Sequence, residues 1–89
     1  MSNTWATLNI YPNPVRDNLH LNILSNINTV ISIKVIDVFG KQLLQLSNNV
    51  KTADNIVNIP VNNLAAGVYY IQLLNEKTNE IITQQFIKQ

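Results

Sequence analysis

Hydrophobic and polar residues alternate with a period of two along much of this chain, the pattern of strands that bury one face. The alternation is clearest where Leu19, Leu21 and Ile23 are separated by His20 and Asn22. Turn residues separate the other apolar runs. The pattern predicts strands near residues 8–10, 19–23, 29–39, 41–46, 56–61, 68–74 and 81–87. About seven short strands at regular spacing favour an all-β fold, an antiparallel β-sandwich with negligible helix.

The segments between these strands carry recognisable turn residues. Asp37 and Gly40 occupy the first and fourth positions of a type I turn, so residues 41–46 are expected to return as the second strand of a hairpin. Pro60 has no N–H for a ladder and marks the end of a strand or an edge. The pair Asn62-Asn63 is suited to capping one helical turn over residues 64–66.

The inward-facing positions of the predicted strands define the expected core. They are Leu19, Leu21, Ile23, Ile33, Val35, Ile59, Ile71 and Leu73. Trp5 falls outside the alternating pattern and is not expected in that core. At 89 residues the chain is one small domain. We expect residues 1–7 to be a linker or an artificial start, and residues 8–89 to form the domain.

Composition narrows the classes of partner. Only 12% of residues are charged and the net charge is +1, so nothing indicates binding to nucleic acid or to an anionic membrane. Cysteine is absent, so the core alone must hold the fold. Residues 1–4 lack the basic and apolar stretches of a secretory signal, and an exported form would carry its signal on a longer precursor.

No catalytic or metal-binding constellation is visible. His20 is the single histidine, it alternates away from the core side, and no nucleophile or orienting carboxylate stands beside it. The acids are dispersed, and Asp37 is best interpreted as a turn residue that accepts backbone N–H groups. We therefore expect no enzyme activity, no cofactor and no metal.

A second motif with a defined physical role is Leu64-Ala65-Ala66-Gly67-Val68-Tyr69, which has the spacing L-x-x-G-x-Y. It resembles the tyrosine corner of immunoglobulin-like and fibronectin-like sandwiches, where the Tyr hydroxyl bonds to upstream backbone. Tyr69 is therefore expected to be structural. The alternative, an exposed Tyr69-Tyr70 pair that stacks on sugar, stays open at this point.

Four spaced segments together resemble the type A C-terminal sorting domains of the type IX secretion system of Bacteroidetes. The first is Tyr11-Pro12-Asn13-Pro14, ahead of the strand with the clearest alternation. The others are residues 33–41, which match the pattern v-x-v-y-D-x-x-G-k, the L-x-x-G-x-Y corner at residues 64–69, and residues 86–88, which match a terminal f-v-K. Ile36 stands where the family often has tyrosine, and Gln89 follows the terminal lysine. The sorting-motif candidates are Tyr11, Pro12, Asn13, Pro14, Asp37, Gly40, Leu64, Gly67, Tyr69, Phe86, Ile87 and Lys88.

The resemblance implies an immunoglobulin-like sandwich that acts as a non-catalytic secretion signal. A covalently linked N-terminal passenger would fold in the periplasm. Outer-membrane machinery, including a β-barrel shuttle protein, would then recognise the domain and move the passenger to the cell surface or medium. A surface signal peptidase would remove the domain by a cut before the first strand, in or upstream of residues 1–7. The rivals are a carbohydrate-binding module and a passive immunoglobulin-like spacer of a secreted enzyme or adhesin.

Overall fold

A computed structural model describes residues 5–89, and these residues form seven strands. The strands are β1 (Ala6–Tyr11), β2 (Asn18–Ser25), β3 (Thr29–Asp37), β4 (Gln42–Val50), β5 (Ala53–Pro60), β6 (Gly67–Asn75) and β7 (Ile81–Lys88). All seven predicted strands are present. The helical turn predicted after Asn62-Asn63 is wrong: this connection is a tight turn in which the Leu64 N–H donates to the Val61 carbonyl at 3.0 Å.

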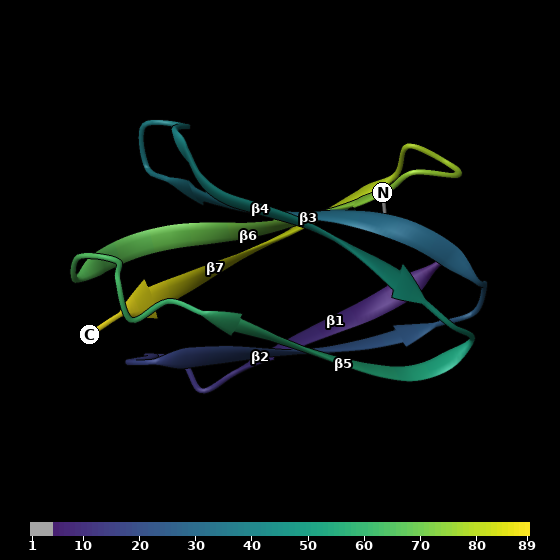
Figure 1. The fold of residues 1–89 in the computed structure, drawn as a ribbon, viewed down its shortest axis with the longest axis horizontal. Helices are drawn as coiled ribbons and strands as arrows, with labels where there is room; N and C mark the ends of the chain where they lie inside the picture. Colours follow the sequence, from purple (N-terminus) through teal and green to yellow (C-terminus); the bar gives the residue numbers. More distant parts are fainter. Residues whose placement is uncertain (1–4) are drawn as a thin grey trace.

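The strands form two antiparallel sheets that pack face to face (Figure 1). One sheet has the order β1-β2-β5 and the other the order β4-β3-β6-β7. The packing of the two sheets follows the predicted alternation, because the apolar side chains of each sheet face the other sheet. The fold is the β-sandwich that the sequence predicts. Pro60 ends β5, an edge strand of the three-stranded sheet, as expected from its missing N–H.

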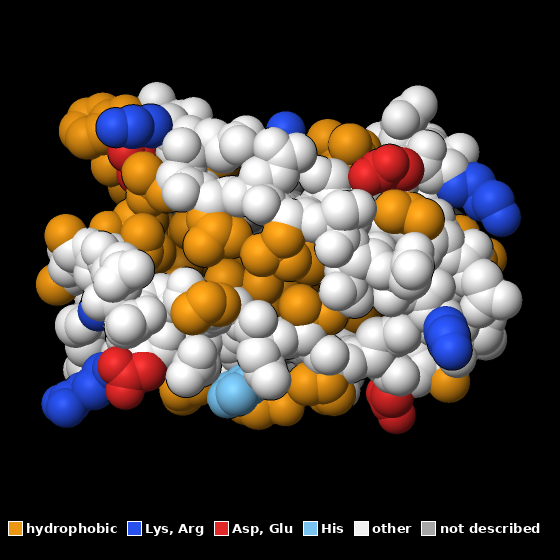
Figure 2. Space-filling model, in the orientation of Figure 1, with side chains coloured by type: hydrophobic (Ala, Val, Ile, Leu, Met, Phe, Trp, Pro, Cys, Tyr) orange, Lys and Arg blue, Asp and Glu red, His pale blue; other side chains and the backbone are white. Residues whose placement is uncertain are grey.

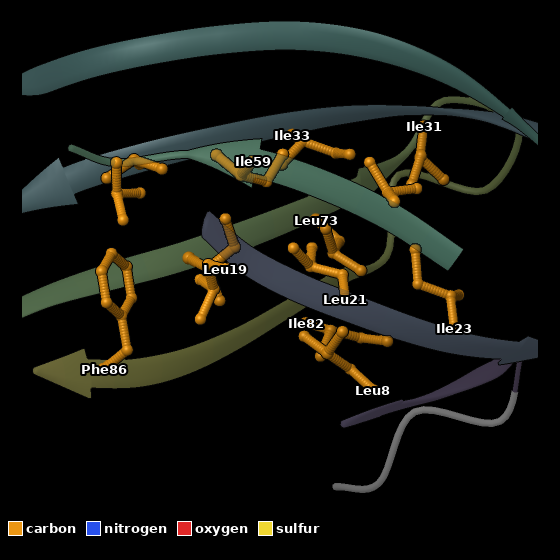
Figure 3. Packing of buried hydrophobic residues seen from close by; sticks show 14 of the residues in the cluster. Leu8, Leu19, Leu21, Ile23, Ile31, Ile33, Ile59, Leu73, Ile82 and Phe86 are labelled. Atoms are coloured by element: carbon orange, nitrogen blue, oxygen red, sulfur yellow. The ribbon is translucent and has the colours of Figure 1, made fainter. Parts of the chain in front are cut away.

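One hydrophobic core fills the space between the sheets (Figure 3). All eight predicted core residues have no exposed surface, and full burial of each such side chain is worth about 1.5–3 kcal/mol. The expectation for Trp5 is wrong, because its side chain is only 3% exposed and belongs to this core. The Asn26 N–H donates to the Trp5 carbonyl at 2.9 Å, which extends the β1–β2 pairing beyond the Ala6–Ser25 pair.

The first strand starts ahead of the expected domain boundary at residue 8. β1 starts at Ala6, and its Ala6–Ser25 pair closes the ladder with β2. Residues 1–4 of the expected linker, and any cleavage position within them, lie outside the described residues. Residues 5–7 are thus part of the folded sandwich.

Candidate functional site

The four motif segments lie together at one end of the sandwich. Because successive strands run in opposite directions, alternate connections lie at the same end of the sandwich. The strand register confirms that these segments are neighbours, through the pairs Tyr11–His20, Asn18–Pro60, Ile36–Gln42, Asp37–Tyr69 and Gly67–Lys88. We call this end, made by residues 12–17, 37–41, 61–66 and 86–89, the motif end. It is on the left in Figure 1. The start of β1 and the connections around residues 26–28, 51–52 and 76–80 lie at the opposite end.

The Tyr11-Pro12-Asn13-Pro14 segment is fastened to the last strand. The side-chain Oδ1 of Asn13 accepts the Ile87 N–H at 2.9 Å, and the Val15 N–H donates to the Ile87 carbonyl at 2.8 Å. The Gln89 N–H then donates to the Val15 carbonyl at 2.8 Å. Val15 itself is fully buried. Val15 therefore forms a single parallel bridge with β7, and residues 13–15 connect the two sheets at the motif end.

The other side chains of this segment face solvent. Tyr11 is 47% exposed and its ring lies 5.3 Å from that of His20, centroid to centroid. His20 in turn hydrogen bonds to Asn58 across the outer face of the sheet. Pro12 and Pro14 line an open pocket of about 400 Å³ together with Arg16, Asp17, Asn18, His20 and Gln89. Asn13 and Val15 thus bind this segment to β7, whereas the side chains of residues 11, 12 and 14 are exposed to solvent.

The Asp37-x-x-Gly40 motif forms a tightly bonded turn between β3 and β4. One carboxylate oxygen of Asp37 accepts the Phe39 N–H and the Lys41 N–H, both at 2.9 Å. The Gly40 N–H donates to the Asp37 carbonyl, and the Asp37 N–H donates to the Lys41 carbonyl, each at 3.0 Å. Gly40 has φ +83°, a conformation that glycine adopts without a steric cost. The predicted role of Asp37 as an acceptor of backbone N–H groups is confirmed.

The tyrosine corner is also confirmed. The Tyr69 hydroxyl donates to the Ala65 carbonyl at 2.6 Å, four residues upstream. The ring is 7% exposed and stacks on Phe86 with centroids 5.7 Å apart. Leu64 packs half-buried against the core, and Gly67 opens β6 with φ +157°. Since Tyr69 is buried, it is not half of an exposed sugar-stacking pair.

Replacing Tyr69 by phenylalanine is expected to lower the free energy of unfolding by roughly 1–2 kcal/mol. The ring and its stacking on Phe86 remain, while the Ala65 carbonyl loses its donor. Chemical denaturation with a fluorescence or circular dichroism readout measures the change. Tyr70→Phe is the matched control, because Tyr70 lies on the outward face of the same strand. An unchanged midpoint for Tyr69→Phe would contradict a stabilising role for this hydrogen bond.

The terminal f-v-K motif divides its three residues between the core and the surface. Phe86 is fully buried, Ile87 is 44% exposed on the outer face, and Lys88 is only 8% exposed. The Lys88 Nζ donates to the Gln89 carbonyl at 2.8 Å. Lys88 therefore lies on the inward side of β7, beside the core. It is not the freely presented terminal charge that its place in the sequence suggests.

The acidic groups and the single histidine of the described residues are dispersed. Within residues 5–89, no group of three or more His, Asp or Glu side chains is placed to hold a metal ion. The pocket at the motif end has Asp17 as its one carboxylate, and a wider open pocket of about 710 Å³ at the opposite end has Glu76. Neither pocket supplies the carboxylate pair that glycoside hydrolysis uses. A search for long apolar helices able to cross a membrane finds none over the same residues.

Two contacts and one exposed side chain have no signal in the sequence motifs. Val15 looks like a loop residue, yet it is fully buried beside β7. Gln84 donates from its side chain to the Leu8 carbonyl at 2.6 Å and so connects β7 to β1. Phe39, inside the turn, is 91% exposed. The apolar character of Val15, directly after Pro14, is the one local indication of the first contact.

Two packed antiparallel sheets and a tyrosine corner define an immunoglobulin-like sandwich domain. The family model described as the secretion system C-terminal sorting domain matches residues 9–89. The chain belongs to this family, and it is a sorting signal of type IX secretion. The comparison with curated proteins gives no match. Family membership implies export to the cell surface or the extracellular space, and interaction with the type IX machinery.

Proposed function

We propose that the motif end is the part of the sorting domain that the outer-membrane machinery reads. The observation that carries this proposal is the gathering of all four motif segments at one end, away from the start of β1. A passenger joined upstream of β1 leaves the sandwich at the opposite end. The machinery, including a β-barrel shuttle protein, can then contact the motif end while a large folded passenger stays clear of it.

The remaining steps of the route are part of the same proposal. The passenger folds in the periplasm, the domain is recognised there, and the passenger then crosses the outer membrane. A surface signal peptidase removes the domain by cutting before β1. The domain itself performs no chemistry. The structure supports this division of labour through the lack of a carboxylate pair or metal cluster over residues 5–89.

The free edge of β7 is a second surface that the machinery can use. Because the Ile87 N–H and C=O point away from β6, those of Thr83 and Gln85 point the same way by strand alternation. Residues 13–15 already occupy the edge at Ile87. Strand addition by a partner would therefore begin at residues 81–85.

The rival functions account for less of the structure. A carbohydrate-binding module needs a row of exposed aromatic rings, whereas Tyr69 is buried and the Tyr11 ring lies tilted against that of His20. A passive spacer needs no end that collects four motifs. The exposed ring of Tyr11 is the feature that keeps sugar binding testable, by titration with soluble polysaccharide.

The proposal is tested by fusing residues 5–89 behind a signal peptide and a folded reporter in a host that has the type IX system. We expect the reporter in the medium or on the cell surface, and we expect it to remain periplasmic when the host lacks the system. A known sorting domain on the same reporter serves as the positive control. The function is wrong if that control is exported while this fusion accumulates in the periplasm.

A further inference from the structure

We propose that the β3–β4 turn presents Phe39 as an apolar anchor that inserts into a hydrophobic pocket on a protein of the secretion machinery. This inference rests on the proposed function and assigns a specific contact within the motif end. The D-x-x-G motif itself names only Asp37 and Gly40. Phe39, one of the two residues between them, is the contact, and the two motif residues support it.

Exposure distinguishes this turn from the rest of the surface. Phe39 is 91% exposed and Val38 is 57% exposed, and they are the two most exposed large hydrophobic side chains among the described residues. Figure 2 shows hydrophobic side chains projecting at the tip of the β3–β4 connection, at the upper left. Single exposed apolar residues are common, but two neighbours at the tip of one turn form a protrusion that water solvates poorly.

The turn is also held in one conformation. Asp37 fixes the backbone of the turn from inside through its carboxylate, which accepts the N–H of Phe39 itself. Two main-chain hydrogen bonds between Asp37 and residues 40–41 close the loop. A side chain presented by a fixed backbone loses less conformational entropy on binding than one on a mobile loop. The hydrogen bonds therefore orient Phe39 without covering it.

The charges around the turn favour a protein pocket over a lipid surface. The motif end carries Arg16, Lys41 and Lys88 against Asp17 and Asp37, and Lys88 is buried. This nearly balanced set lacks the basic cluster that draws a protein to anionic lipid. A protrusion of one aromatic and one β-branched residue instead matches the buried aromatic anchors at the centre of protein interfaces.

The position of the turn fits the same partner. Asp37 pairs with Tyr69 across β3 and β6, and the turn joins β3 to β4, the edge strand of the four-stranded sheet, next to the strands β6 and β7 that carry two of the other motifs. A partner that covers the motif end from β7 to β4 would contact Phe39. An anchor at this point fixes the orientation of the domain as well as its affinity.

The test replaces Phe39 by serine in the exported fusion. We expect export to fall about tenfold or more, in line with the loss of a single interface hot spot. Phe39→Leu should keep most of the export, since it preserves an apolar anchor. Ile56→Ser is the matched control, because Ile56 is 56% exposed on the outer face of the other sheet. The melting temperature of Phe39→Ser should match that of the unchanged domain.

The possible outcomes distinguish a failure of the Phe39 anchor from a failure of the proposed sorting function. If the unchanged fusion is not exported, both fail. If it is exported and Phe39→Ser is exported equally well, the anchor alone is wrong. Two further measurements check the partner class: co-sedimentation with vesicles of phosphatidylcholine and phosphatidylglycerol, and light scattering of the free domain. Vesicle binding or self-association that depends on Phe39 would overturn a pocket on the machinery as its target.

Discussion

Deletion of residues 82–89 is expected to abolish cooperative thermal unfolding and to abolish export of a fused reporter. The deletion removes two buried core residues, Ile82 and Phe86, and leaves β6 as an unpaired edge. It also removes the Ile87 backbone groups to which Asn13 and Val15 are bonded. The Y-P-N-P segment would therefore lose its hydrogen bonds to the last strand, although the segment itself is kept.

Circular dichroism melting of the truncated domain and the distribution of the reporter between periplasm and medium measure these two losses. Thr83→Ala is the control within the same strand, because Thr83 faces outward and its removal keeps the ladder with β6. This variant should melt close to the unchanged domain. A truncated domain that still unfolds cooperatively and still exports its reporter would show that β7 is dispensable for both.

Phe86→Ala is expected to destabilise the domain by about 3–5 kcal/mol. Phe86 is fully buried and stacks on Tyr69, so the substitution leaves a cavity beside the tyrosine corner. Domains of ordinary stability have only about 5–15 kcal/mol in total, so much of the folded population would be lost at growth temperature. Export should fall with it.

Phe86→Leu keeps an apolar side chain at this position and should recover most of the stability and export. A comparison with Phe39→Ser separates the two kinds of motif-end residue. Phe86→Ala lowers export through the fold, whereas Phe39→Ser lowers it with an unchanged melting temperature. Stability is measured by denaturant titration. A Phe86→Ala domain as stable as the parent would mean that the terminal aromatic residue is not a core residue.

Local patterns were sufficient to predict the strands, the β-sandwich and the eight core residues. Alternation with a period of two depends on neighbouring residues alone, and the spacing of Leu64, Gly67 and Tyr69 indicates a corner that bonds over four residues. The turn at Asp37 is equally local, since its acceptor and donors lie within residues 37–41. These features could therefore be read before the fold was known.

Contacts between distant segments could not be predicted in this way. Val15 is buried because β7, over seventy residues later, passes beside it. Trp5 belongs to the core because the β1–β2 pairing continues past the start of β1, where no alternation signals it. Lys88 is buried because the inward phase of β7 turns its side chain toward the core, which its charged character does not indicate. Each of these depends on how strands are placed against one another.

The odd number of strands has a consequence for how such a domain can vary. Among residues 5–89, seven consecutive antiparallel strands put the start of β1 and the end of β7 at opposite ends of a body 34 Å long. Inserting or losing a hairpin changes the count by two and keeps this polarity. A change of one strand would reverse it and bring the final segment next to the start of the first strand. Parity therefore limits this architecture to variation in whole hairpins.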